Sequence, residues 1–171
     1  MIIRKAQLKD VEQMAIVHVD SWKTTYKGIV SEDYLATLKY EDREKLWHSA
    51  LSSSNFVWVA EVHNKVVGFI SGGKERTSEY NYDGEIYAIY ILKEHQKSGI
   101  GKKLIQAFSR EMKEVGNFNS ILVWVLSQNP SQQFYQGLKA VKVDSAVIDI
   151  GNEKHEEFAF GWPRIDTLID G

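Results

Sequence analysis

The chain has 171 residues, of which 43% are hydrophobic, 12% aromatic and 26% charged, and its formal net charge is −2. This is the composition of an ordinary globular protein and not of a disordered chain, and the length predicts a single domain over residues 1–171. The absence of cysteine excludes a disulfide framework, a thiol nucleophile and a zinc site built on thiolates.

The charge and the apolar pattern also restrict the partners. A net charge of −2 argues against general nucleic-acid binding, which needs a broad basic surface. No apolar run is long enough to span a membrane, and the start at residues 1–5 lacks the apolar core of a signal peptide. We therefore expect a cytoplasmic protein with neither a nucleic-acid nor a membrane partner.

The N-terminal third predicts one strand followed by helices. Residues 1–6 predict a short strand, and Asp10 can cap a helix that continues to about Ser21. Residues 22–30 predict a loop. Two short helices are then expected, at 32–38 and 41–51.

In the middle of the chain the apolar pattern changes from one typical of helices to one typical of strands. Apolar, β-branched and aromatic residues predict strands at 56–62 and 66–70 around a hairpin-sized connection. A polar loop is expected at 72–83. The segment 85–92 is apolar on both faces, as in the centre of a sheet.

The last third predicts two more helices and three strands. An amphipathic helix is expected at 99–115, a buried strand at 121–126 and a short helix at 130–137. Two closing strands follow at 141–150 and 156–162. The order of elements predicts an α/β (α+β) domain with a mixed, partly hairpin-connected sheet flanked by helices.

The clearest functional signal lies between the central strand and the amphipathic helix. Gly99 and Gly101 permit a turn whose backbone N–H groups point outward, and a helix start adds unpaired donors. The eleven residues from Lys93 to Lys103 carry a net charge of +3 within a chain of −2. This combination predicts a site for phosphate or pyrophosphate, although a glycine-rich turn before a solvated helix explains the two glycines equally well.

Two common phosphate-binding motifs do not fit this segment. A P-loop whose second glycine is Gly101 would need glycine in place of Gln96 and Ser or Thr in place of Lys103. The dinucleotide motif that starts at Gly99 would need glycine at Leu104. The pattern that remains is Q-x-x-G-x-G after a central strand.

The segment from Ile89 to Gly101 resembles the strand and pyrophosphate loop of the GNAT superfamily of acetyl-CoA-dependent N-acetyltransferases, whose signature is [RQ]-x-x-G-x-[GA]. A second block is similar as well: Asn129, Tyr135 and Gly137-Leu138 match N-x(5)-Y-x-G-[FL]. The predicted order of elements resembles the GNAT fold, a mixed sheet of about seven strands, and small bacterial members in particular. Gln96 replaces the commoner Arg, which the signature allows, and Lys93 stands where Pro is frequent.

The resemblance implies a site for acetyl-CoA. The main chain of Ile89, Tyr90 and Ile91 would hold the pantetheine arm, and the amide of Ile91 would donate to the thioester oxygen. Asn129 matches the residue that bonds the pantetheine, and Tyr135 would also lie beside the cofactor. The pyrophosphate would be held by the loop, formed by Gln96, Lys97, Ser98, Gly99, Ile100, Gly101 and Lys102.

The resemblance also implies roles for two catalytic residues. Tyr135 matches the tyrosine that protonates the leaving sulfur, although a core aromatic would look the same in the sequence. Glu85 is a candidate base that would deprotonate the amine, usually through water, and strand alternation predicts that it shares a face with Ile91. A carboxylate at the surface end of a strand is the alternative.

The acceptor site would come from the loops at 22–30 and 72–83. Trp22, Tyr26, Tyr80 and Tyr82 could line it, and the acidic residues of the second loop would favour a cationic amine. A solvated loop explains those acidic residues more simply. The five histidines show no metal-ligand spacing, so no metal is expected.

We therefore expect an enzyme that transfers acetyl from acetyl-CoA directly to a primary amine of a small molecule or peptide. A non-catalytic acyl-CoA-binding sensor is the alternative, and an unrelated nucleotide binder is a third. The strand at 156–162 could pair with a second subunit to form a homodimer, or simply close the sheet.

Overall fold

A computed structural model describes residues 1–53 and 56–171. Over these residues the chain forms one seven-stranded sheet in the order β1-β2-β3-β4-β5-β7-β6. This confirms the mixed α/β architecture with helices on the sheet. The strands are β1 (Ile2–Lys5), β2 (Phe56–Val62), β3 (Lys65–Lys74), β4 (Gly84–Ile91), β5 (Ile121–Leu126), β6 (Val141–Ile150) and β7 (Glu153–Trp162).

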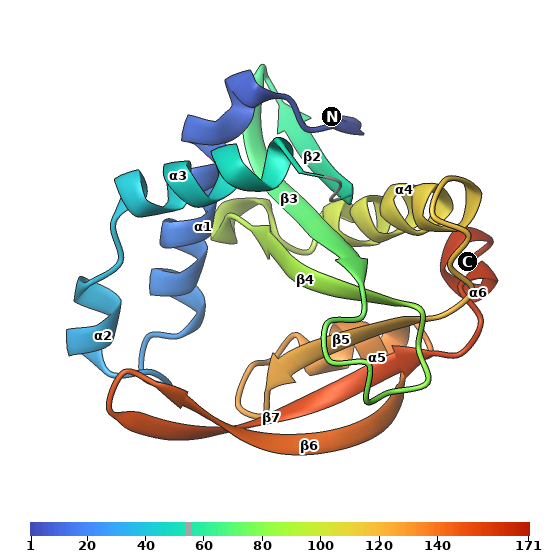
Figure 1. Ribbon diagram of the computed structural model, residues 1–171. Coiled ribbons are helices and arrows are strands. Elements are labelled where there is room, and N and C mark those ends of the chain that lie inside the picture. Colours follow the sequence, from blue (N-terminus) through green and yellow to red (C-terminus); the bar gives the residue numbers. More distant parts are fainter. Residues whose placement is uncertain (54–55) are drawn as a thin grey trace.

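The sheet splits between its two central strands. β4 and β5 form the parallel pair, and they pair only where residues 84–86 meet residues 121–123. Beyond that point the two strands diverge (Figure 1). The split leaves the second half of β4 without a strand partner on one side among the described residues, so its backbone groups are available to a ligand.

A β-bulge in β4 changes which side chains share a face. Ser71 of β3 pairs with Ala88, but the next residue, Gly72, pairs with Ile86, so Tyr87 is an extra residue on β4. As a result Ile86, Ile89 and Ile91 all pack into one core cluster. The simple alternation that predicted Glu85 on the face of Ile91 is wrong, because the bulge shifts the period.

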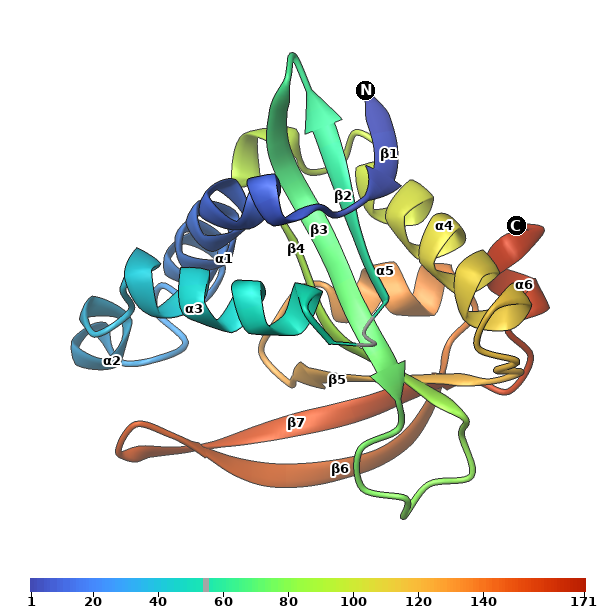
Figure 2. The same cartoon turned by 45° about the horizontal axis from the view of Figure 1, so that its top comes forward.

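Helices cover both faces of the sheet, and each face has its own core. Figure 2 shows α1 (Val11–Thr25) and α3 (Tyr40–Leu51) on one side of the sheet and α4 (Ile100–Glu114) on the other. The first core packs Met14, Val17 and Trp47 against β2 and β3. The remaining helical segments are η1 (Leu8–Asp10), α2 (Glu32–Ala36), η2 (Lys93–His95), α5 (Gln132–Gly137) and α6 (Asp166–Ile169).

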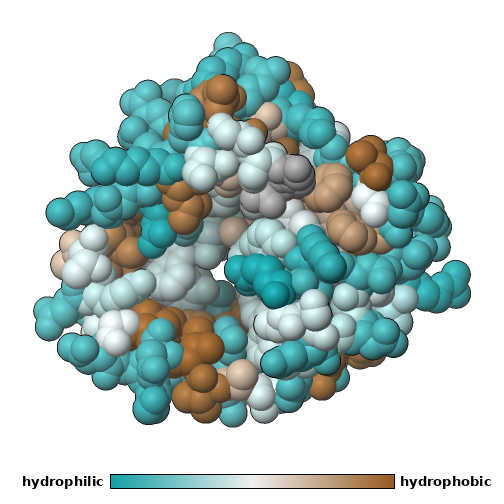
Figure 3. All heavy atoms as spheres, viewed as in Figure 1, coloured by the Kyte–Doolittle hydropathy of each residue, from teal (hydrophilic) through white to brown (hydrophobic). Residues whose placement is uncertain are grey.

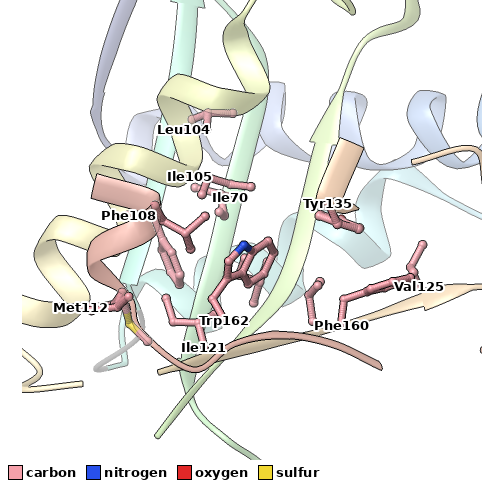
Figure 4. Packing of buried hydrophobic residues seen from close by; sticks show 14 of the residues in the cluster. Ile70, Leu104, Ile105, Phe108, Met112, Ile121, Val125, Tyr135, Phe160 and Trp162 are labelled. Atoms are coloured by element: carbon pink, nitrogen blue, oxygen red, sulfur yellow. The ribbon is translucent and has the colours of Figure 1, made fainter. Parts of the chain in front are cut away.

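The larger core lies under α4. The apolar stripe predicted for this helix is buried from Ile100 to Met112, whereas Val115 lies beyond the helix and is exposed. Figure 4 shows Leu104, Phe108 and Met112 of α4 in the same cluster as Trp162 of β7. Tyr135 of α5 packs against the edge of the Trp162 ring, with 6.0 Å between centroids. Burial of side chains of this size stabilises a fold by roughly 2 kcal/mol each. This core fixes α4, and with it the loop before α4, against the split in the sheet.

Several predicted boundaries differ from the structure. α1 continues to Thr25, so Trp22 lies in its last turn and not in a loop. Thr24 and Thr25 are weak helix formers, and contacts of Trp22 with the sheet stabilise this turn. β3 continues to Lys74, where a side chain at Gly72 would collide with Phe108 at 2.6 Å, which explains why glycine stands in the strand.

The C-terminal hairpin corrects one prediction about assembly. β7 begins at Glu153 and pairs with both β5 and β6. It is therefore an interior strand with no free edge for a second subunit, and β1 and β6 form the edges of the sheet. Within the described residues, every helix is too short or too polar to cross a membrane.

Candidate active site

A cavity of about 750 Å³ occupies the split between β4 and β5. Its walls are residues 86–91 of β4 and 123–126 of β5. The C-terminal end of α1, the loop before α4, the start of α5 and parts of β6 and β7 complete it. Figure 3 shows the hollow on this face of the molecule.

The loop before α4 has the geometry of an anion site. Gly99 is the N-cap residue of α4 with φ of 82°, a left-handed conformation that favours glycine, and no side chain caps the helix. The first helical bond described runs from the Lys103 N–H to the Gly99 carbonyl at 3.2 Å. The amides of residues 100–102 precede that bond and form no backbone hydrogen bond among the described residues, so they can bind an anion.

Three lysines give this end of the cavity a positive charge. Lys93, Lys97 and Lys102 all line it. The Gln96 side chain lines it too, and its Nε2 donates to the Ile91 carbonyl at 3.0 Å, which ties the loop to the end of β4. The structure thus brings five of the seven predicted loop residues together at one end of the cavity: Gln96, Lys97, Gly99, Gly101 and Lys102.

Ser98 and Ile100 are exceptions among the predicted loop side chains. The Ser98 hydroxyl donates to the His95 carbonyl at 2.5 Å. The Ile100 side chain is buried in the main core. Neither lines the cavity, so any contact of these two residues with a ligand would come from their backbone.

Asn129 and Tyr135 both line the cavity beside β5. The Asn129 Nδ2 donates to the Tyr26 hydroxyl at 3.1 Å, and its Oδ1 accepts from the Ser131 N–H at 2.9 Å. Tyr135 is only 4% exposed, and burial raises the pKa of its hydroxyl above the usual value. Tyr135 therefore keeps its proton at neutral pH.

Aromatic residues form the opposite wall. Trp22 and Tyr26 from α1 pack together with 4.5 Å between ring centroids, and both line the cavity. The Trp22 Nε1 donates to the Tyr90 hydroxyl at 2.8 Å. Behind Tyr90, the buried His18 stacks on its ring at 4.9 Å. The structure therefore brings Trp22 and Tyr26 into the cavity lining, and their role in binding the acceptor stays a prediction.

The other two predicted acceptor residues lie outside the cavity lining. The Tyr80 hydroxyl donates to Asp144 at 2.7 Å, and its ring packs on Trp124, which does line the cavity. Tyr82 lies over Gly161, where a Cβ would come within 2.4 Å of its ring. Both tyrosines fasten the β3–β4 loop to the last hairpin.

Two acidic residues of that loop, Glu75 and Asp83, accept hydrogen bonds from backbone N–H groups in or next to the loop. Glu75 is buried, and its carboxylate accepts from the Thr77 N–H at 3.0 Å and the Ser78 N–H at 2.5 Å. These bonds lower the pKa of Glu75 against the opposing effect of burial. Asp83 accepts from the Asn119 N–H at 2.7 Å. Thus neither of these two carboxylates contributes to the cavity wall.

Glu85 is also outside the cavity lining. Its carboxylate is almost fully buried and accepts three hydrogen bonds from Arg76, from Nη2 at 2.6 Å, from Nε at 3.2 Å and from the backbone N–H at 3.1 Å. The Arg76 guanidinium in turn lies over the Tyr87 ring, 4.5 Å from its centroid. The base role of Glu85 stays a prediction, and the carboxylate it concerns is ion-paired.

A different carboxylate, Glu157, belongs to the cavity and was not predicted from the sequence. It lies on β7, is half-buried and lines the cavity. Burial raises the pKa of Glu157. Its signal in the sequence was weak, because it is one of three glutamates near the start of a hairpin strand, and only the pairing of β7 with β5 shows that it faces the split.

The divided sheet, the anion-binding loop and the cavity between them define an acyltransferase of the GNAT fold. Residues 19–138 match the acetyltransferase (GNAT) family, so the chain belongs to this family. It is an N-acetyltransferase, and acetyl-CoA is its acetyl donor.

Relatives and solved structures agree with this assignment. The N-acetyltransferase YuaI of Bacillus subtilis (strain 168), itself uncharacterised, is 39% identical over 97% of this chain and 95% of its own. The spermidine N(1)-acetyltransferase of Thermoplasma acidophilum is 29% identical over 67% of this chain and 71% of its own. Among solved structures, the PaiA N-acetyltransferase of Thermoplasma acidophilum in complex with coenzyme A superposes with a TM-score of 0.76 at 25% identity, over 94% of this chain and 96% of that one.

Proposed function

We propose that the protein transfers acetyl directly from acetyl-CoA to a primary amine of a small molecule or peptide while both are bound. The observation that carries this proposal is the single cavity with two unlike ends. A basic, amide-rich end suits a pyrophosphate, and a separate aromatic wall leaves room for a second molecule. The chain has no cysteine to carry acetyl between two half-reactions, which favours direct attack.

The residues of the cavity fit acetyl-CoA, which supplies an acetyl group activated as a thioester. The free amides at the start of α4 and the side chains of Lys93, Lys97 and Lys102 would hold the phosphates. Asn129 would bond the pantetheine from the β5 side.

The exposed backbone of β4 would orient the reacting end. The Leu92 N–H donates to the Val67 carbonyl at 2.9 Å. Because backbone groups alternate along a strand, the N–H groups of Ile89 and Ile91 then point away from β3 and into the split. We expect the N–H of Ile91 to donate to the thioester oxygen, where a preorganised donor stabilises developing negative charge.

Tyr135 would hold the proton for the leaving sulfur. Its hydroxyl stays protonated at neutral pH because burial raises its pKa. The thiol of the leaving group has a reference pKa of about 8.5, so at neutral pH the released sulfur ends up protonated and needs a proton donor. A buried phenol beside the sulfur is therefore suited to donate the proton from Oη. Glu85, as the predicted base, would have to act through water from outside the cavity lining.

The test is release of free CoA thiol with a panel of polyamines, amino acids, aminoglycosides and peptide N-termini. We expect at least one amine to give turnover, with intersecting initial-rate plots when both substrates are varied. Parallel plots would contradict transfer in a ternary complex. Tight binding of acetyl-CoA without turnover on any amine would favour a non-catalytic acyl-CoA sensor.

A further inference from the structure

The two ends of the cavity carry opposite charge. Three lysines line the end nearest α4. Among the described residues that line the cavity, Glu157 is the one with a carboxylate. The basic end matches the phosphates of acetyl-CoA. The carboxylate has no such partner in that molecule, so it requires another explanation.

The backbone of Glu157 is held by strands on both sides. Its strand, β7, lies inside the sheet, where Glu157 pairs with Leu126 of β5 on one side and Ala146 of β6 on the other. Within the described residues its carboxylate has no hydrogen bond and no ion pair. A half-buried carboxylate without a partner costs free energy unless a cation or a proton reaches it.

The charges around Glu157 leave it available as a proton acceptor. Arg76 lowers its pKa and Glu85 raises it, and these two residues are already paired with each other at 2.6 Å. Burial is the largest influence, and it raises the pKa of Glu157. Burial raises the pKa of Tyr26, which also lines the cavity, and the negative charge of Glu157 raises it further. A carboxylate with a raised pKa is a stronger base than an exposed one.

The surroundings suit an amine that arrives as a cation. Trp22 and Tyr26 present ring surfaces to the cavity, and Leu126, Ile148 and Ile150 add aliphatic surface. Aromatic faces attract ammonium groups, and an apolar wall strengthens the attraction to a carboxylate. The same apolar wall would favour loss of the proton once the ammonium is desolvated.

We propose that the Glu157 carboxylate receives the ammonium group of the acceptor and takes up its proton before the amine attacks. This inference rests on the proposed function. The ammonium gives one proton to Glu157 and becomes a neutral amine, which forms the C–N bond as the C–S bond breaks. Tyr135 gives its proton to the sulfur, and the second proton that the amine loses as the amide forms replaces it on Tyr135. Glu157 releases the first proton to solvent, so the net reaction yields one proton, the amide and the CoA thiol.

The test compares Glu157→Gln with the matched variant Glu156→Gln. Glu156 is the neighbouring residue on β7, is exposed, and lies outside the cavity lining. With an amine that the wild type acetylates, we expect kcat/KM for Glu157→Gln at pH 7 to fall about 100-fold. Glu156→Gln should stay within a factor of two, and Glu157→Asp should recover part of the activity.

The pH profile separates a proton acceptor from a structural residue. In the Gln variant only the neutral fraction of the amine can react. Its kcat/KM should therefore rise about tenfold per pH unit below the amine pKa of about 10.4. The wild type should have a flatter profile over pH 7 to 9, so the loss in the variant shrinks as the pH rises. The affinity for acetyl-CoA should be the same in both proteins, which also shows that the variant is folded.

Failure of this inference can be told from failure of the proposed function. If the wild type acetylates an amine and Glu157→Gln keeps its rate and its pH profile, Glu157 is not the proton acceptor but the function stands. If Glu85→Gln instead loses activity with the same pH signature, the base is Glu85. If the wild type releases no thiol with any amine, both proposals fall.

Discussion

The two ends of the cavity are built in different ways. The basic end comes from one continuous stretch, in which the end of β4 leads through a short turn into α4. The proposed acceptor end is assembled from α1, β5, β6 and β7, and α1 ends at Thr25 whereas β5 begins at Ile121. In our proposal the first end would bind through backbone amides and lysines, whereas the second would rely on particular side chains.

This difference explains how such a protein can keep its donor and change its acceptor. A turn whose backbone N–H groups hold phosphate needs glycine in the right place, and most other side chains there are free to vary. A wall made of Trp22, Tyr26 and Glu157 changes its chemistry with each substitution. If the proposed assignment is right, the fold fixes the donor end and side chains set the acceptor end.

Tyr135 is predicted to act where the two ends meet, so its loss should have the largest effect. We expect Tyr135→Phe to lower kcat about 100-fold, because the proton for the leaving sulfur is gone. The affinity for acetyl-CoA should change less than twofold, since the ring and its packing on Trp162 remain. Thiol release and calorimetric titration measure the two quantities.

Tyr40→Phe is the matched control for Tyr135→Phe. The Tyr40 hydroxyl donates to Asp20 at 2.7 Å on the exposed surface of α3 and lies outside the cavity lining. Its removal should leave kcat unchanged. A full rate in Tyr135→Phe would remove the acid role and leave Tyr135 as a core aromatic.

His18, which stacks on Tyr90 behind the aromatic wall, should make the stability of the protein depend on pH. Burial, assisted by Arg43, lowers the pKa of His18 from 6.5 to about 3. Below pH 6.5 the unfolded chain binds a proton at His18 that the folded chain does not. The free energy of unfolding therefore decreases as the pH is lowered, until the folded protein also binds this proton near pH 3. Between pH 7 and pH 5 this loss amounts to about 2 kcal/mol.

Urea unfolding at pH 7 and pH 5 measures the contribution of His18. His18→Gln keeps an acceptor for the Trp47 Nε1, which bonds His18 at 3.2 Å in the wild type. We expect the variant to lose about 2 kcal/mol less than the wild type over this pH range. The exposed His48, changed to Gln, should keep the wild-type difference, and an equal slope in all three proteins would show that His18 is protonated in the folded state.

The sequence predicted the fold well where the signals are local. The amphipathic stripe of α4, with Leu104 and Phe108, and the apolar strand before it are periodic patterns that survive in the structure. The bulge at Tyr87 could not be predicted, because it is set by how β3 and β4 pair around the glycines of β3. The last turn of α1 was missed because its stability comes from the bond of Trp22 to Tyr90 and not from helix propensity.

The candidate site divides in the same way. Gly99, Gly101 and the lysines around them could be predicted because the whole loop is contiguous in the sequence. Glu157 could not, since its position in the cavity depends on β7 lying between β5 and β6. The role expected of the acidic residues in the β3–β4 loop does not follow from charge alone, because Glu75 bonds the turn that it belongs to.

Charge reversal at the basic end should weaken donor binding alone. We expect Lys102→Glu to raise the Kd for acetyl-CoA about tenfold, and the effect should shrink at high salt because the charges are exposed. Lys103→Glu makes the same change in net charge one residue further along α4, outside the cavity lining. It should shift Kd less than twofold, and equal effects of the two variants would mean that only the general field of the helix start matters.

The smallest effect should come from the aromatic wall. Trp22→Phe removes the 2.8 Å bond to the Tyr90 hydroxyl, and we expect a loss of about 1 kcal/mol in stability with about a fivefold higher KM for the amine. Trp58→Phe is the control, since the Trp58 Nε1 donates to Glu111 at 2.6 Å on the other side of the sheet. Trp58→Phe should cost at least as much stability and leave the KM of the amine unchanged. If both variants raise that KM equally, the rise reflects a loosened fold, and the aromatic wall at Trp22 has no specific part in holding the acceptor.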